Sequence, residues 1–219
     1  MAANLKNGLY GPVSGKIGQL VFCKRNGKTY VRSAPKKKKL RKVSKKQLSV
    51  RSRFKMTQQL VSYLLPYIRI GFKYTQPDKT ATNAAMSYNL REAFKFDDEL
   101  QNYRLQWNNI SFSRGIPNVA EAIKFELVTN ELKITWQINS SKRKQLDLYT
   151  FKCCVLILPE NYDMERLQGC INENSITSGI QCLQVDIIPE SRYHVYIAFF
   201  SNDGRGRVMD SEWIGLINA

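Results

Sequence analysis

The first 77 residues of the chain contain no aspartate and no glutamate; the first acidic residue is Asp78. The same stretch holds 19 of the 34 lysines and arginines, which leaves 15 basic and 18 acidic residues for the rest of the chain. The net charge of +16 therefore arises in the first third of the sequence. Solvated basic surfaces normally include acids that limit self-repulsion. Their absence here indicates that a partner supplies the compensating anions.

The chain also lacks a long apolar run. No stretch of 18 or more apolar residues occurs, so we expect no transmembrane helix. The N-terminus has no apolar stretch of the kind that a secretory signal needs. We therefore expect the protein to remain in the cytoplasm of the cell that makes it, or in a virion if the gene is phage-derived.

Histidine and metal-binding patterns are scarce. His194 is the only histidine, and the five cysteines form no Cys-x-x-Cys pair. A hydrolase needs a base, and His194 lies in a predicted strand. Asp97-Asp98-Glu99 follows a predicted helix and is typical of a solvated acidic end. We expect no metal, no cofactor and no catalytic site, although catalytic carboxylates far apart in the sequence stay open.

A phosphate-binding loop is the first motif to consider, because residues 11–16 read Gly-Pro-Val-Ser-Gly-Lys. That motif needs a glycine where this chain has Tyr10, and Ser or Thr where it has Ile17. A predicted strand follows, so no helix N-terminus faces a phosphate there. Nucleotide binding by this loop is therefore not predicted.

A β-hairpin is predicted over residues 16–33. Asn26-Gly27 suits the two positive-φ positions of a type I′ turn. That turn places Arg25 opposite Lys28, with Lys24 beside them. Like charges this close are unfavourable without an anion. An ordinary solvated turn is the alternative interpretation.

A basic run with little to bury occupies residues 35–46 and spans about 40 Å when extended. Ser44 and Gln47 predict a capping box at the start of a helix over 45–64. A second helix is predicted over 81–95. From apolar spacing, the predicted inner sides of the two helices are Val50, Phe54, Val61 and Leu65, and Met86, Leu90 and Phe94.

The candidate binding residues for a polyanion come from the hairpin, the basic run and the first helix. They are Lys24, Arg25, Lys28, Arg32, Lys36, Lys37, Lys38, Lys39, Arg41, Lys42, Lys45, Lys46, Arg51, Arg53 and Lys55.

From about residue 100 the apolar pattern changes from a helical period to strict alternation. Strands are predicted over 103–112, 123–127, 132–138, 148–158, 180–187, 193–200 and 208–214. Short strands at this spacing favour an antiparallel β-sandwich. The predicted fold class is therefore α+β, with a basic hairpin-plus-helices region over residues 1–115.

The C-terminal half resembles a fibronectin type III domain. Ile187-x-Pro189-x-x-x-Tyr193 is similar to the tyrosine corner of that family, and Trp136 lies on an early strand. The resemblance implies that residues 116–219 form a fibronectin III/Ig-like sandwich. It also implies a structural role for Tyr193, whose hydroxyl would bond to the backbone. The spacing over 159–179 departs from the family's even pattern.

A second resemblance spans most of the chain. The pattern is similar to an uncharacterised Bacteroidota family classed as a domain of unknown function. The matching motifs are Gly11-Pro-Val-Ser-Gly-Lys-Ile-Gly18, Asn26-Gly27, Tyr30-Val-Arg-Ser-Ala-Pro35, Gln47, Arg51, Phe54, Gly71-Phe72, Asn83-Ala84 and Ser113-Arg114-Gly115. This resemblance implies a bacterial or prophage origin and carries no established activity.

These observations predict a non-enzymatic protein that binds a polyanion. Lysines and arginines gain affinity for nucleic acid by releasing counterions from phosphates, whatever the base sequence. No arginine is assigned to a base edge, so we expect binding without strong sequence preference. The alternative is a structural or assembly protein, of phage or virion type or interacting with other proteins, whose basic arm contacts acidic neighbouring subunits. Self-assembly is compatible with either.

Overall fold

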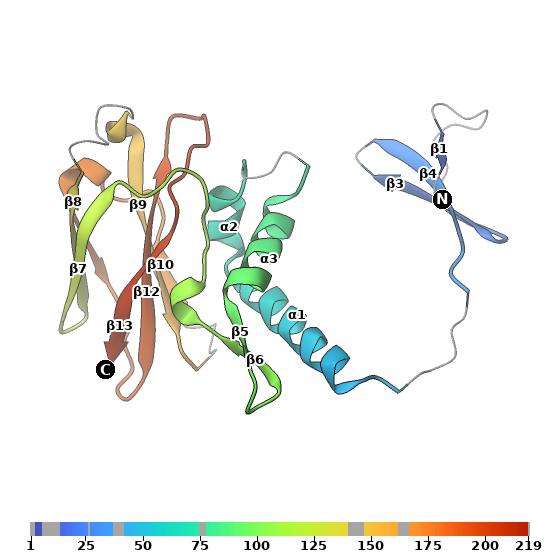
Figure 1. Ribbon diagram of the computed structural model, residues 1–219. Helices are drawn as coiled ribbons and strands as arrows, with labels where there is room; N and C mark the ends of the chain where they lie inside the picture. The colour runs from blue at the N-terminus through green and yellow to red at the C-terminus, as the bar shows by residue number, and fades with distance from the viewer. Residues whose placement is uncertain are drawn as a thin grey trace. The chain divides into compact units, whose positions relative to one another are not determined.

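Figure 1 shows the computed structural model, which describes residues 3–5, 14–25, 27–36, 42–74, 78–139, 147–161 and 167–218. The chain forms two compact units, residues 1–43 and residues 44–219. Within the described ranges, no helix is long and apolar enough to cross a membrane.

An antiparallel sheet makes up the described part of the first unit. Its strand order is β1-β4-β3-β2, with β1 (Ala3–Leu5), β2 (Gly15–Ile17), β3 (Leu20–Arg25) and β4 (Lys28–Ser33). The β3–β4 hairpin has the predicted register, with Arg25 opposite Lys28. Gly27 has a φ of 75°, as the predicted turn requires. Asn26, the other turn residue, lies outside the described residues.

Three helices open the second unit: α1 (Lys45–Tyr63), α2 (Leu65–Gly71) and α3 (Ala81–Glu92). The predicted capping box at the start of α1 is confirmed. The Ser44 hydroxyl accepts from the Gln47 backbone N–H at 3.3 Å, and the Gln47 side chain accepts from the Ser44 N–H at 3.2 Å. Pro66 lies in the first turn of α2, where a missing N–H is tolerated. Thr80 caps α3, with its side chain accepting from the Asn83 backbone N–H.

The rest of the second unit is β-rich, and the α+β prediction with a C-terminal sandwich is confirmed. One sheet has the order β10-β9-β12-β13, with β9 (Phe151–Pro159), β10 (Gln168–Cys170), β12 (Arg192–Ser201) and β13 (Glu212–Asn218). The other has the order β11-β8-β7, with β7 (Ala120–Val128), β8 (Glu131–Ile138) and β11 (Ile180–Gln184). A hairpin of β5 (Phe94–Asp97) and β6 (Asn102–Leu105) leads into them, with short 3₁₀ turns η1 (Trp107–Asn109), η3 (Leu148–Thr150) and η5 (Ile176–Ser178). The Tyr193 hydroxyl accepts from the Ile188 backbone N–H at 3.3 Å, so Tyr193 has the structural role that the resemblance implied.

Strand β9 is buried on both faces. Successive side chains of a strand point to opposite sides. Cys153 and Val155 belong to the core between the two sheets, whereas Cys154 and Leu156 belong to the core shared with the helices. The sheet of β9 and β12 is therefore the middle layer of three, with the helices over one face and the sheet of β7, β8 and β11 over the other (Figure 1). This explains the unbroken apolar run of β9.

The boundary predicted at residue 115 does not coincide with a boundary between compact units, which lies between Val43 and Ser44. Leu60, Leu64 and Ile68 pack in one core cluster with Leu156. Alternation along a strand reveals two faces but not which segment covers each, so the sequence does not indicate that the helices share a core with the strands.

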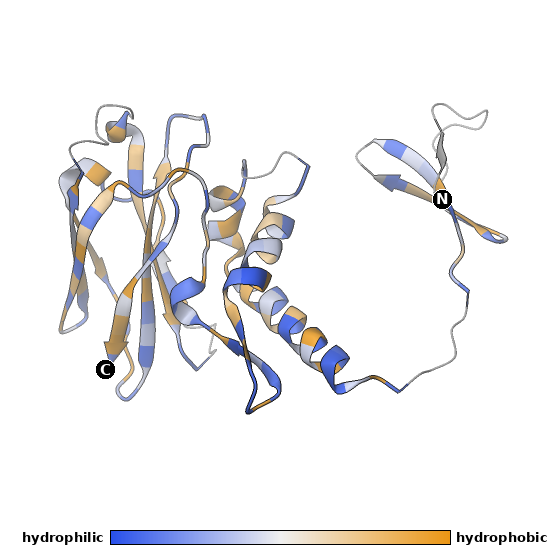
Figure 2. Ribbon diagram, viewed as in Figure 1, coloured by the Kyte–Doolittle hydropathy of each residue, from blue (hydrophilic) through white to orange (hydrophobic). Residues whose placement is uncertain are grey.

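The inner face of α1 also differs from the prediction. Its buried residues are Ser49, Thr57, Leu60 and Val61, whereas Val50 is 47% exposed and Phe54 is 50% exposed. Figure 2 shows the resulting mixture of hydrophilic and hydrophobic residues along this helix. Val61 is buried as predicted. The side that meets α3 and β6 is partly polar, so apolar spacing alone misplaced Val50 and Phe54. In α3 the buried residues are Ala84, Ala85 and Asn89 rather than Met86 and Leu90, and Phe94 is buried as the first residue of β5.

Two strand predictions require correction. The segment after η1, residues 110–115, is irregular and belongs to no strand, and the last strand begins at Glu212 rather than at residue 208. Ile110 and Phe112 are both buried despite this. Their alternation reflects burial of an irregular segment, whose polar groups bond to side chains of another loop.

Candidate polyanion-binding surface

One face of the first unit's sheet carries three exposed cations. Register pairs Lys16 with Val21 and Val21 with Arg32, so these three side chains share a face. Lys28 lies four residues before Arg32 on β4 and therefore on the same side. Tyr30, half-buried, lies between Lys28 and Arg32. Lys16 was not among the candidate residues; only the register reveals that it joins them.

The other candidates of the first unit are distributed differently. Lys24 is exposed and pairs with Thr29, on the opposite face of the sheet. Arg25 is opposite Lys28 by backbone register. Lys36 and Lys42 are exposed. Lys37, Lys38, Lys39 and Arg41 lie outside the described residues.

The cations of α1 belong to the second unit. Lys45, Lys46, Arg51 and Lys55 are exposed. The absence of acidic residues from the first turn of α1 leaves its N-terminal N–H groups without a favourable charge partner beyond the Ser44 cap. This end of the helix therefore adds to the positive potential of the lysines.

Arg53 differs from its neighbours because an aromatic ring holds it. Its guanidinium carbon lies 4.0 Å from the centroid of Tyr103, and Tyr103 in turn meets Phe96 edge-on at 5.2 Å. The Nε atom of Arg53 is buried without a hydrogen-bond partner. Stacking restrains the guanidinium, which reduces the entropy lost when it binds an anion. Arg53 is thus the candidate cation whose position is best fixed.

Within the second unit, four described acids pair with later arginines. The ion pairs are Asp97–Arg104, Asp210–Arg114, Glu160–Arg192 and Asp203–Arg207. No described cation of residues 45–73 pairs with a described acid of that unit. The first unit has no acid of its own, so neither candidate group has a described carboxylate of its own unit as a partner.

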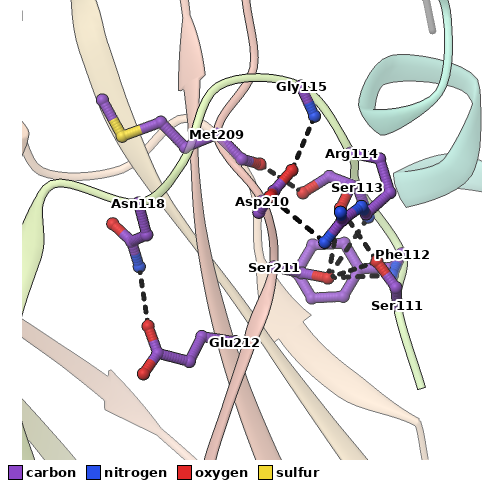
Figure 3. Close-up of polar contacts among 10 residues, drawn as sticks. All are labelled: Ser111, Phe112, Ser113, Arg114, Gly115, Asn118, Met209, Asp210, Ser211 and Glu212. Atoms are coloured by element: carbon purple, nitrogen blue, oxygen red, sulfur yellow. Dashed lines mark hydrogen bonds and ion pairs between the residues drawn. The ribbon is translucent and has the colours of Figure 1, made fainter. Parts of the chain in front are cut away.

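A serine cluster was not predicted from the sequence (Figure 3). The Ser211 hydroxyl lies 3.0 Å from that of Ser111 and accepts from the Phe112 backbone N–H at 3.1 Å. The Ser113 hydroxyl donates to the Met209 carbonyl at 2.7 Å. These bonds tie the segment before β7 to the loop before β13.

A charged pair continues this brace. The Arg114 guanidinium lies 3.1 Å from the Asp210 carboxylate, which also accepts from the Gly115 backbone N–H at 2.7 Å. Arg114 packs over the Tyr88 ring of α3 at 4.8 Å. The motif Ser113-Arg114-Gly115 is the only sequence signal of the brace, because nothing in the sequence connects it with Ser211.

None of the described residues supplies a base to these serine hydroxyls. A serine nucleophile needs a neighbouring group that takes its proton. The hydroxyls of Ser111, Ser113 and Ser211 bond to backbone groups or to one another. Asp210, the nearest acid of the brace, holds Arg114 and a backbone N–H. The arrangement is that of a structural brace.

Comparison with known proteins places the whole arrangement in one family. A family model described as "Family of unknown function (DUF6266)" matches residues 12–215. The chain belongs to this family. The match begins before the hairpin of the first unit and ends within β13, so a DUF6266 chain includes the basic sheet, the helices and the sandwich together.

Other comparisons add little to the DUF6266 assignment. No curated protein matches the chain. A solved structure titled "Myokine structure" is similar at 14% identity, covering 47% of this chain and 97% of that chain with a TM-score of 0.33. A likeness at that level carries no argument about fold or activity.

The sole histidine of this DUF6266 chain lies between two tryptophans. The His194 ring stacks on Trp107 with centroids 4.6 Å apart, and its Nδ1 accepts from the Trp213 indole N–H at 3.2 Å. Its Nε2 is buried without a partner. Burial lowers the pKa of His194, opposed by the nearby Glu160 carboxylate. The neutral ring is therefore a packed core group rather than a general base for the serines.

This environment predicts an acid-sensitive fold. The pKa of His194 in the folded state lies below its ordinary value. Its contribution to the unfolding free energy is therefore fully present above about pH 6.5 and is lost as pH falls towards the folded-state pKa. We expect the unfolding free energy to drop by up to about 1.4 kcal/mol per pH unit below pH 6.5. Urea unfolding followed by tryptophan fluorescence measures it, because Trp107, Trp136 and Trp213 all belong to the second unit.

The His194→Phe variant, which keeps a ring between the tryptophans, is the control for this titration. It should show no such slope between pH 5 and pH 6.5. An equal slope in the variant would assign the acid sensitivity to other groups.

The five cysteines are free thiols, and four of them have a raised pKa. Burial raises the pKa of Cys153 and Cys154 well above the ordinary range, and raises that of Cys170 to about 11. A thiolate, not a thiol, is the nucleophile and the metal ligand. Cys182 is exposed, but desolvation and the neighbouring Glu131 raise its pKa too. Among the described residues no three metal-binding side chains cluster.

Proposed function

We propose that this DUF6266 chain is a non-enzymatic protein that binds polyanions, with nucleic acid as the main partner. The observation that carries the proposal is the uncompensated charge: residues 1–77 contain no acid, and within the second unit no described cation of residues 45–73 pairs with a described carboxylate. Self-repulsion of such a surface is relieved when phosphates replace the missing acids.

The geometry of the basic sheet supports nucleic acid over smaller anions. Lys28 and Arg32 lie on one strand face, about 13 Å apart for four residues of 3.3–3.4 Å each. Isolated small anions would meet one of these cations at a time, whereas a phosphate backbone meets several. Tyr30 between them offers a ring for a base to stack on. No arginine is assigned to a base edge, so we propose binding without strong sequence preference.

The proposed location of the protein is one where nucleic acid is present. A cytoplasmic protein of bacterial origin, or a virion component if the gene belongs to a prophage, would meet nucleic acid directly. A structural or assembly protein whose basic arm contacts acidic subunits is the second candidate, favoured by the same acid-free stretch of residues 1–77, whose missing anions acidic neighbours would equally supply.

A salt titration tests the proposed function. Nuclease-treated protein is mixed with a fluorescent DNA duplex of random sequence, and Kd is measured by anisotropy between 50 and 200 mM NaCl. With six or more phosphate contacts we expect affinity to fall by roughly 10³-fold over that range. Similar Kd values for duplexes of different sequence are expected as well.

A weak salt dependence is the opposing outcome. If Kd changes less than about twofold between 50 and 200 mM NaCl, fewer than one phosphate contact is made, and nucleic-acid binding is rejected. Tight binding to a poly-glutamate chain but not to DNA would favour the acidic-subunit alternative.

A further inference from the structure

The sheet of the first unit has a second face that is apolar. Register places Ile17 opposite Leu20 and Phe22 opposite Val31. Leu20 and Phe22 are two residues apart on β3, so all four side chains point to the same side. Ile17 is 62% exposed and Leu20 is 47% exposed. Polar or charged residues are the usual choice for a sheet face in water, so this face is built to be covered.

Among the described residues of the first unit, no second layer covers this face. Every described side chain from residue 14 to residue 43 is exposed or only half-buried. A single layer of short strands buries too little apolar surface to offset the entropy of folding, and stable domains are made of two packed layers. A second layer is therefore required.

The distribution of charge identifies the kind of second layer. Lys16, Lys28 and Arg32 lie on the opposite face, and Lys24 near the hairpin tip is the one cation described on the apolar side. An acidic partner bound to the apolar face would therefore lie on the side of the sheet away from most of its cations. A second copy of the same sheet finds a matching apolar surface of equal size.

We propose that two copies of the chain pair through the face formed by Ile17, Leu20, Phe22 and Val31. The two sheets stack about 10 Å apart, in a two-fold arrangement in which each face meets itself. Both cation faces then point outward, where a polyanion reaches them. The pair is a two-layer sandwich with a dry interior and two basic exteriors.

The interface is small and opposed by charge. Four strands spaced about 4.8 Å apart and up to six residues long give a face of roughly 15–20 Å on each side, so the pair buries on the order of 600–800 Å². That is below the 1,200–2,000 Å² of stable interfaces. Each copy also brings twelve lysines and arginines in residues 1–43. Pairing is therefore expected when these charges are screened or neutralised.

Two conditions provide that neutralisation. At 1 M NaCl the screening length is about 3 Å, which removes the repulsion whether or not the protein binds nucleic acid. At low salt a polyanion does the same, so two copies bind one strand cooperatively. This second condition rests on the proposed function; the first does not.

Sedimentation velocity of the nuclease-treated full chain tests the pairing. We expect a 25.3 kDa monomer at 50 mM NaCl, and a species of twice that mass at 1 M NaCl or with a 40-nucleotide oligo-dT at low salt. The Ile17→Thr/Leu20→Thr variant keeps β-branched residues in the strands and should stay monomeric in 1 M NaCl. The matched control, Val21→Thr/Cys23→Thr, changes the opposite face and should pair like the wild type.

The outcomes separate the two proposals. A wild type that stays monomeric in 1 M NaCl overturns the pairing, as does a variant at Ile17 and Leu20 that pairs as well as the control. Pairing in 1 M NaCl without any DNA binding at 50 mM supports the interface and rejects the proposed function. Unchanged tryptophan fluorescence in both variants shows that the second unit is intact.

Discussion

Replacing Lys16, Lys28 and Arg32 together with glutamine is expected to weaken duplex DNA binding by roughly a few hundred-fold at 100 mM salt. Each phosphate contact contributes a slope of about 0.9 to the plot of log affinity against log salt. Losing three contacts therefore lowers this slope by about 2.7. Because 0.1 M lies one decade of salt below 1 M, the association constant at 0.1 M falls by about 2.7 decades. Anisotropy titrations at several salt concentrations measure both quantities.

The matched control removes the same three charges elsewhere. Lys124, Lys133 and Arg205 are exposed cations of the second unit, on β7, β8 and the loop after β12. Their replacement with glutamine is expected to change affinity by less than about tenfold. Equal losses in the two variants would mean that net charge, rather than the face of the basic sheet, determines binding.

The Gly71→Ala variant is expected to lose about 3 kcal/mol or more of unfolding free energy. An alanine Cβ at this position would lie 2.2 Å from the Phe112 carbonyl oxygen and 2.5 Å from the Ser113 Cβ. The clash is with backbone that the Ser211 brace holds in place, so relief requires the brace to shift. Helix propensity favours alanine by only about 1 kcal/mol, which is smaller than the cost of overpacking. Urea unfolding followed by tryptophan fluorescence measures the loss.

Gly204→Ala separates this clash from backbone strain. Gly204 has a φ of 75° and open space around the position of a Cβ, so alanine there is strained without being crowded. We expect a loss of about 1 kcal/mol. If Gly71→Ala costs no more than Gly204→Ala, the close approach of α2 to the brace is not a constraint.

Local signals in the sequence predicted local structure well. The Asn-Gly pair set the β3–β4 register because a two-residue turn leaves one pairing. Ser44 and Gln47 marked the start of α1, since each bonds the other's backbone. The adjacent residues Cys153 and Cys154 lie on opposite faces of β9, as period-2 alternation along a strand requires, and both faces are buried.

Longer-range structure was not readable in the same way. The helices contact the outer face of β9 and β12. In the sequence, however, the apolar run of a buried strand is the same whichever segment covers it. The inner side of α1 includes Ser49 and Thr57, whose burial depends on the polar neighbours they meet. Ser211 lies about a hundred residues from the backbone that it holds.

The sequence predicted which residues belong to the candidate site but not how they are arranged in space. The charge asymmetry identified the basic residues, yet it could not divide them between two compact units. The face that joins Lys16 with Arg32 exists only through strand register. The stacking of Arg53 on the Tyr103 ring depends on a hairpin fifty residues away in the sequence.

The double-sided burial of β9 has a consequence for how this fold evolves. A sandwich whose outer sheet is wet can be cut out and reused beside unrelated neighbours. Here Cys154, Leu156 and Leu158 would face water once the helices were lost, so the sandwich is not a portable module. Recombination would be tolerated only at the junction between Val43 and Ser44. A crossover there exchanges the basic sheet and keeps the helices and both sheets of the second unit together.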